Sequence, residues 1–299
     1  MKKYIKNNIV VMLILVIFSI IFLNADYEVI QDYKRVKENR VHMLEKCKTD
    51  NLKQEEKELC DLIVNQKNIE VDFYTLFSQT LVWKVQYVYY LAFFIVVIPP
   101  LLIICKILKN KYIINFTTRE SYNVFLKKIF KTAYKYIWVL PLLCLIMMIP
   151  LMLNSTLNPE YAIVNHSIIW ESNIIYHPLL FVITYLIYIV ILSITFINIS
   201  LLVARKQQKF IPCILFAYIV YFAIEIFFET VVRVFIFLNI FKSDFGTLFN
   251  ILNIFSFNDI YGVGALLLLN LSFAIISFIL VYLAYRNKEK LLIQCEKNK

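Results

Sequence analysis

Glycine is nearly missing from this sequence. Three of the 299 residues are glycine, at positions 246, 262 and 264. So low a content excludes the glycine-rich loops that bind phosphate groups, and it argues against glycine-mediated packing of membrane helices. Histidine is equally scarce, and the three histidines lack the spacing of a metal site. Because no paired nucleophile and base is visible either, we expect no catalytic residue, no metal and no cofactor.

Polar residues are too few for a soluble protein of this length. Hydrophobic residues make up 61% of the chain, and the mean hydropathy is +0.69, whereas soluble domains contain about 45–50% apolar residues. We therefore predict an all-α, polytopic membrane protein. The net charge of +10 lies in short segments beside apolar runs. That placement argues against binding to nucleic acid, which requires a continuous basic face.

Six apolar runs are candidates for membrane-spanning helices. They occupy residues 9–23, 85–107, 137–153, 179–203, 211–240 and 263–285. We assign residues 1–25 to the first transmembrane helix, 85–107 to the second, and 137–299 to helices three to six with a tail. The alternative for the first run is a cleaved signal peptide, although bulky Leu23 lies where cleavage favours a small residue.

The distribution of charge predicts which segments face the cytoplasm. The predicted cytoplasmic segments carry nineteen basic and three acidic residues: 1–8, 106–136, 204–210 and 286–299. The predicted outer segments carry eleven basic and sixteen acidic residues: 24–84, 154–178 and 241–262. Positive residues are retained on the cytoplasmic side during insertion. We therefore expect six crossings with both termini in the cytoplasm.

Residues 26–84 are polar and predict a helical hairpin outside the cell. In the first arm, apolar side chains recur at alternating steps of four and three. A polar turn separates this arm from a second helix around residues 52–65. Cys47 and Cys60 flank the turn, so two antiparallel arms would bring them together as a candidate disulfide. Two reduced thiols packed within the hairpin are the alternative.

The segment 106–136 carries eight Lys or Arg residues and one acid, Glu120. Thr117 and Glu120 form a capping-box pattern that predicts the start of a helix. Apolar residues then recur on one face of that helix, and lysines cover the rest. Basic amphipathic helices lie at membrane surfaces. One interpretation of this helix is that anionic lipid is sufficient to hold it there. The alternative to lipid is a cytoplasmic partner that docks on this helix.

Three ionisable residues interrupt the fifth apolar run: Glu225, Glu229 and Arg233. Their spacing of four places them on one helical face, so Glu229 and Arg233 can pair. At 1.5 Å per residue, Glu225 lies ~21 Å along the helix from Ile211. That depth is near the middle of a bilayer, so Glu225 is the better candidate for lining a polar path. Glu229 and Arg233 lie nearer the outer interface, where we expect a structural pair.

The whole layout resembles the permease subunits of type-2 ATP-binding-cassette exporters. The resemblance covers nearly the whole chain: six spans, a polar loop after the first, a basic helix after the second and a broken apolar segment before the sixth. The local match is Arg119-Glu120-Ser121-Tyr122 followed by Lys127-Lys128. The missing glycines and the long first loop depart from the family pattern.

The resemblance implies a non-catalytic subunit of a bacterial cell membrane that exports an amphiphilic peptide, drug or lipid. Segment 108–136 would be a cytoplasmic coupling helix, and a segment near 241–262 would re-enter the membrane. Two permease copies would form the pathway. The following residues would contact an ATPase on a separate chain: Thr117, Arg119, Glu120, Tyr122, Lys127 and Lys128. The alternative is a membrane-anchored sensor or immunity-type protein that binds an extracellular peptide through the 26–84 hairpin.

Overall fold

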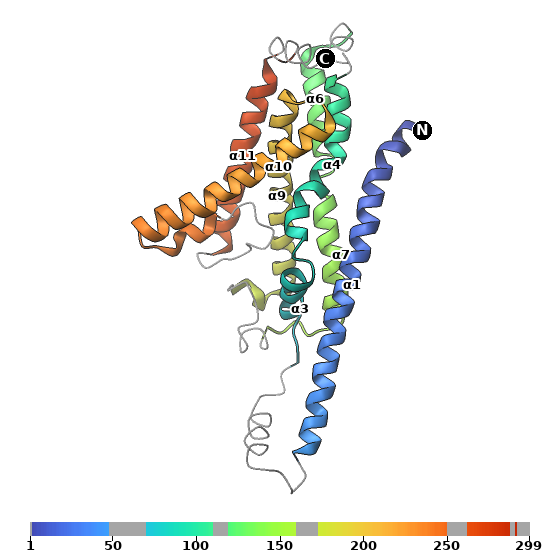
Figure 1. Ribbon diagram of the computed structural model, residues 1–299, viewed down its shortest axis with the longest axis vertical. Helices are drawn as coiled ribbons and strands as arrows, with labels where there is room; N and C mark the ends of the chain where they lie inside the picture. Colours follow the sequence, from blue (N-terminus) through green and yellow to red (C-terminus); the bar gives the residue numbers. More distant parts are fainter. Residues whose placement is uncertain are drawn as a thin grey trace. The chain divides into compact units, whose positions relative to one another are not determined.

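The computed structural model describes residues 2–47, 70–109, 119–159, 173–249, 262–287 and 291. Every regular element in these ranges is helical (Figure 1), apart from one isolated bridge between Asp72 and Thr156. Six helical stretches among them are long and apolar enough to cross a membrane. The predicted all-α class is therefore confirmed for the described residues, and six helices able to span a membrane are present.

The chain divides into two compact units. The first unit contains residues 1–18, 87–145 and 170–299, and the second contains residues 19–86 and 146–169. Most of the apolar helices lie in the first unit. The second unit contains the polar half of the first helix and the segment that leads into the second span.

Helix α1 (Lys2–Lys46) is a single unbroken helix of 45 residues. At about 1.5 Å per residue it is ~67 Å long, roughly twice the ~30 Å hydrocarbon core of a bilayer. No proline or glycine occurs within it, so the backbone has no reason to end the helix where the apolar run stops. The helix therefore continues past residue 25 into the predicted hairpin, and the end of the membrane-spanning part at residue 25 stays a prediction. The predicted second arm around residues 52–65 lies outside the described residues.

In the second unit, α3 (Phe73–Gln79) is followed directly by the π-helix η1 (Thr80–Lys84). Asp72 caps α3, because its Oδ1 accepts a hydrogen bond of 2.7 Å from the Thr75 amide. The Phe73 amide donates to the Thr156 carbonyl at 2.9 Å. This backbone contact ties the start of α3 to the chain that follows α7 (Val139–Leu153).

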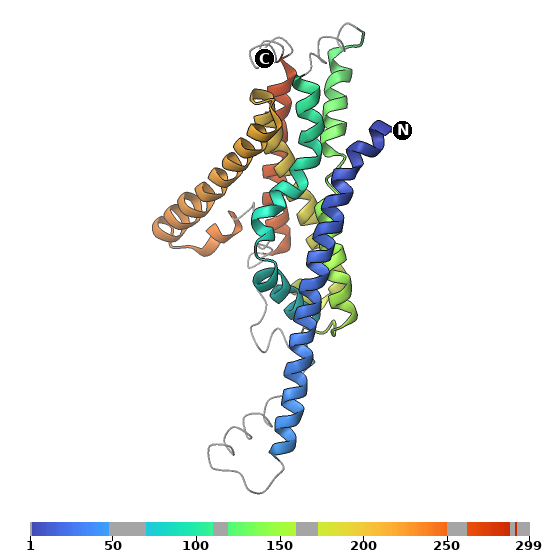
Figure 2. The same cartoon turned by 45° about the vertical axis from the view of Figure 1, so that its right-hand side comes forward.

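In the first unit, α9 (Pro178–Lys206) is the central helix (Figures 1 and 2). It packs against three helices: α4 (Val88–Lys109), α10 (Phe210–Ile226) and α11 (Val263–Arg286). Aromatic rings fill part of the space between them. The ring of Phe93 on α4 lies 5.0 Å from Tyr221 on α10 and 5.4 Å from Phe196 on α9, measured between centroids.

Beyond Ile226, α10 continues as the π-helix η3 (Phe227–Ile240), which leans away from α9 (Figure 2) and has no buried residue. The chain then turns back, and the short 3₁₀-helix η4 (Asp244–Phe249) packs along η3. Gly246 permits this close approach, since a Cβ there would lie 2.8 Å from the Phe237 Cβ and 2.9 Å from the Arg233 Cα. The rest of the predicted re-entrant segment, residues 250–261, lies outside the described residues.

Candidate coupling surface and intramembrane polar groups

The predicted coupling helix is α6, which extends from Tyr122 to Tyr134. It therefore begins later than the capping-box pattern at Thr117 and Glu120 predicted. Ser121 is the N-cap residue because its backbone is extended. Arg119 and Glu120 lie in the preceding turn with their side chains exposed, and Thr117 lies outside the described residues.

The amphipathic character predicted for this helix is confirmed. Its buried face is formed by Phe125, Leu126, Ile129 and Ala133. The lysines occupy the opposite, exposed surface: Lys127, Lys128, Lys131 and Lys135. The helix thus packs on the bundle through one side and leaves its positive charges accessible on the other.

A polar network links α6 to two helices of the bundle. The Tyr134 hydroxyl donates to the Asn198 Oδ1 on α9. The Asn198 Nδ2 donates in turn to the Ser277 Oγ on α11 at 2.8 Å and to the Ala274 carbonyl at 3.2 Å. Asn198 is fully buried, so these bonds replace the water that its amide would otherwise need. We did not predict this network, although Asn198 is the only amide side chain in the apolar run 179–203.

Tyrosine and phenylalanine side chains hold the remainder of α6. The Tyr122 hydroxyl donates to the Tyr285 carbonyl at the end of α11. The Tyr285 hydroxyl donates to the Leu201 carbonyl on α9 at 2.9 Å. The ring of Phe130 on α6 lies 5.9 Å from Phe278 on α11, between centroids. The N-terminal end of α6 is therefore attached to α11, and its C-terminal part is attached to both α9 and α11.

The exposed lysines of α6 belong to a larger basic end of the first unit. The C-terminal ends of α4, α9 and α11 and the N-terminal ends of α6 and α10 lie together there (Figures 1 and 2). Basic residues of these helix ends and their connections include Lys106, Arg119, Lys127, Lys128, Arg205, Lys206, Lys209 and Arg286. We call this set the basic end. Its arrangement suits an anionic surface, whether of lipid or of protein.

The structure separates the three intramembrane ionisable residues into two groups. Arg233 Nη1 donates to Glu229 Oε1, so the predicted pair is present. The side chains of Arg233 and Glu229 are 33% and 41% exposed. Glu225 is instead buried, with 8% of its surface exposed, and its Oε2 has no hydrogen-bond partner among the described residues. The helix changes from α to π at Phe227, between Glu225 and the pair.

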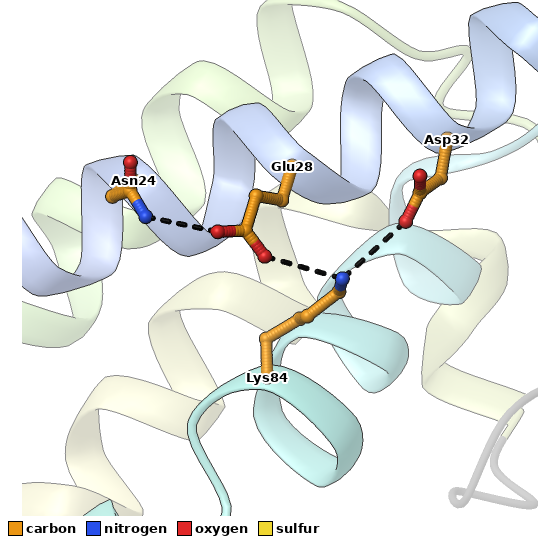
Figure 3. Close-up of polar contacts among 4 residues, drawn as sticks. All are labelled: Asn24, Glu28, Asp32 and Lys84. Atoms are coloured by element: carbon orange, nitrogen blue, oxygen red, sulfur yellow. Dashed lines mark hydrogen bonds and ion pairs between the residues drawn. The ribbon is translucent and has the colours of Figure 1, made fainter.

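The polar half of α1 is attached to η1 by an ion-pair cluster (Figure 3). Lys84 Nζ lies 3.2 Å from Glu28 Oε2 and 3.3 Å from Asp32 Oδ2. Asn24 donates to Glu28 at 3.0 Å, and both residues lie on α1. Hydrogen bonds to Glu28 and then to Asp32 raise the pKa of the Lys84 ammonium above its usual value. Lys84 therefore stays charged throughout the physiological pH range.

The described cysteines differ in oxidation state. Cys47, at the end of α1, is disulfide-bonded. Cys60 lies outside the described residues, so the pairing of Cys47 with Cys60 stays a prediction. Cys105, Cys144 and Cys213 are buried free thiols within the apolar helices.

No protein-family model matches the chain, and no curated protein or solved structure matches it either. Membership of the exporter family is therefore not shown.

Proposed function

We propose that the chain is the membrane-spanning permease subunit of an ATP-driven exporter, working as one of two copies with an ATPase on a separate chain. The observation that carries this proposal is the placement of α6. Its apolar face is buried on the helix bundle, and its lysines are exposed at the basic end. When a partner bound to the exposed side of α6 changes conformation, α6 would be displaced and would transmit the displacement to the membrane helices.

The contacts of α6 support such transmission. Tyr134 joins α6 to Asn198 of α9, and Asn198 joins α9 to Ser277 of α11. Hydrogen bonds between membrane helices contribute about 0.6 kcal/mol each on average and rarely above ~1.7 kcal/mol. Two such bonds from α6, made by Tyr122 and Tyr134, together with the ring contacts attach it to α9 and α11, so that it would move with them. The exported substrate would be an amphiphilic peptide, drug or lipid.

The charges of the basic end would select the partner. Arg119 precedes α6, and Lys127 and Lys128 lie on its exposed side. Cations on a protein rim guide an acidic partner and set its orientation. Anionic lipid would bind the same cations at ~1 kcal/mol each. Two ligands could therefore bind the cations of the basic end: the acidic groove of an ATPase, or the surface of an anionic membrane. The experiment below distinguishes them.

The test is co-purification from native membranes with epitope-tagged chains. Arg119→Glu and Lys127→Glu should each lower the amount of a co-purified protein with a Walker-type nucleotide-binding sequence about tenfold, equivalent to ~1.4 kcal/mol. Lys34→Glu is the matched control, because Lys34 is also exposed but lies on α1. Equal recovery of the ATPase with all three variants would contradict the proposal. Loss of binding only to vesicles with anionic lipid would assign α6 to the membrane surface.

A sensor that binds an extracellular peptide is the second candidate, and the extension of α1 favours it. The helix continues far beyond its apolar run, and Lys84 and Gln79 attach it to the segment before α4. A rigid, charged helix is a suitable surface for a peptide. A photo-crosslinking residue at the exposed Val36 should then capture a peptide from the growth medium, whereas one at Ile219 on α10 should not. Capture at Val36 with no associated ATPase would favour the sensor.

A further inference from the structure

An aspartate lies in the buried stripe of α1. Phe22, Ala25, Asp26 and Val29 are all buried, and their spacing of three, one and three places them on one face of the helix. Asp26 is the most completely buried of the four, with 0% of its surface exposed. An apolar residue is expected at such a position, so the carboxyl group calls for a physical explanation.

The Asp26 carboxyl has no cation among the described residues to stabilise a negative charge. Neither of its oxygen atoms makes a hydrogen bond with any described residue. The Thr80 hydroxyl on η1 faces the carboxyl and favours its charged form, but the burial of Asp26 outweighs this contact. Thr80 is the first residue of the π-helix η1. Segments of π-helix occur frequently at functional sites because they re-aim side chains.

The charged groups of the neighbouring elements are directed elsewhere. Lys84, the cation of η1, binds Glu28 and Asp32 on α1. Asp72 at the start of α3 caps that helix through the Thr75 amide. Two further titratable groups belong to α1 and α3. Tyr33 on α1 accepts a hydrogen bond from Gln79, and Tyr74 on α3 is buried. No described cation is therefore left to neutralise Asp26.

We propose that Asp26 is a proton-binding site, whose carboxyl carries a proton while α1 is packed against η1 and whose ionisation loosens that packing. An ionised carboxylate that is buried without an opposite charge is costly, and one hydroxyl group does not offset that cost, so the group takes up a proton instead. The protonated carboxyl gains a donor that can reach the Thr80 oxygen. The inference concerns the second unit alone and does not depend on the exporter proposal.

A proton fits this site better than a metal ion does. The unpartnered oxygens are the two of Asp26 and the hydroxyl of Thr80. Hard cations such as Ca²⁺ require six to eight oxygen ligands. No cluster of three or more His, Cys, Asp or Glu residues suited to a metal occurs within the part of the chain that the structure describes. The ligand class is therefore the hydrogen ion.

Infrared spectroscopy of the purified full chain in lipid nanodiscs tests the proposal directly. A protonated carboxylic acid has a carbonyl stretching band that a carboxylate lacks. At pH 7 this band should be present in the wild type and lost in Asp26→Asn. Glu28→Gln is the matched control, because Glu28 is on the same helix but is exposed and paired with Lys84. Glu225→Gln identifies any band from Glu225, whose Oε2 is also buried without a hydrogen bond among the described residues. An Asp26→Asn spectrum with the wild-type band would overturn the proposal.

Two further measurements cover the remaining outcomes. A carbodiimide reacts with protonated carboxyls in apolar surroundings, so mass spectrometry of the labelled wild-type chain should find the adduct on Asp26 and not on Glu28. This experiment needs no variant that has to fold. If the Asp26 band appears only after Na⁺ is replaced by choline, an alkali cation occupies the site and the proton assignment is wrong.

The stability of the chain should depend on pH in a defined direction. A carboxyl in an unfolded chain ionises near pH 3.9, whereas Asp26 holds its proton in the folded state. Stability should therefore fall as pH rises above ~4. The melting temperature of Asp26→Asn should exceed that of the wild type at pH 7, and the difference should shrink toward pH 4. A difference that is constant over this range would contradict the proposal.

Discussion

Asn198 is the point at which three helices exchange side-chain hydrogen bonds, so its replacement is the most direct test of how α6 is attached. We consider Asn198→Leu, which keeps the branched shape and the number of heavy atoms of the side chain and removes every hydrogen bond of the amide. The Tyr134 hydroxyl on α6 then loses its acceptor, and Ser277 on α11 loses its donor. Ser277 retains its bond to the Ala274 carbonyl at 2.9 Å. Tyr134 is therefore the group that is left unsatisfied.

The expected loss can be worked out from these contacts. Asn198 makes three hydrogen bonds to other helices, to Tyr134, Ser277 and the Ala274 carbonyl. At about 0.6 kcal/mol for each bond between membrane helices, their sum is ~2 kcal/mol. Tyr134→Phe alone should cost ~1 kcal/mol. Because the Tyr134–Asn198 bond is lost in both single variants, the double variant should be more stable than additivity predicts by roughly 0.5–1 kcal/mol.

The assay is reversible unfolding of the chain in mixed micelles, with the wild type, both single variants and the double variant measured together. Asn270→Leu is the control, because Asn270 is also a buried asparagine but its amide bonds to the Leu266 carbonyl of its own helix at 2.9 Å. Protease cleavage near Arg119 provides a local measurement, and it should accelerate in Asn198→Leu but not in Asn270→Leu. Strict additivity of Tyr134→Phe and Asn198→Leu would refute the network.

Two further predictions concern other contacts. Gly246→Ala should lower the free energy of unfolding by about 1–3 kcal/mol, because its Cβ would overlap Phe237 and the backbone of Arg233. Gly264→Ala, where nothing lies within 4 Å, should be neutral or stabilising by up to ~1 kcal/mol because alanine favours the helix. In thermal unfolding, equal effects at the two glycines would contradict the close approach of η4 to η3. Lys84→Met should cost about 0.2–1 kcal/mol at pH 7, since its partly exposed ion pairs are screened by solvent. Because the pKa of Lys84 is raised in the folded state, this contribution is complete below the unfolded value of ~10.4 and is lost only as pH rises beyond it. A difference from the wild type that already disappears between pH 7 and pH 9 would contradict this assignment.

Properties that repeat along the chain were predictable from the sequence. The six spans follow from the length of the apolar runs, and the two faces of α6 follow from the recurrence of its apolar residues. The pair between Glu229 and Arg233 follows from their separation by one helical turn. Each of these depends on neighbours within a single helix, which is what periodicity reports.

Contacts between distant segments were not predictable in the same way. Asn198 and Ser277 are far apart in sequence, and nothing in either apolar run indicates that they meet. Asp26 begins the polar segment 26–84, and nothing in that segment indicates that Asp26 is buried and faces Thr80 of η1. The length of the first helix could not be read from the sequence in the same way. A change from apolar to polar side chains alters the surroundings of a helix, but α1 contains no glycine or proline that would stop it.

The place of Gly246 against η3 has a consequence for how the chain can tolerate substitution over time. Where bulky rings separate helices, as between Phe93 and Tyr221, a changed side chain can be absorbed when its neighbours adopt new rotamers. At Gly246 the backbone of η4 lies directly on that of η3. A side chain at this position would meet atoms that no change of rotamer can move. Related chains should therefore vary freely among large apolar residues in the bundle and still retain glycine at this one position.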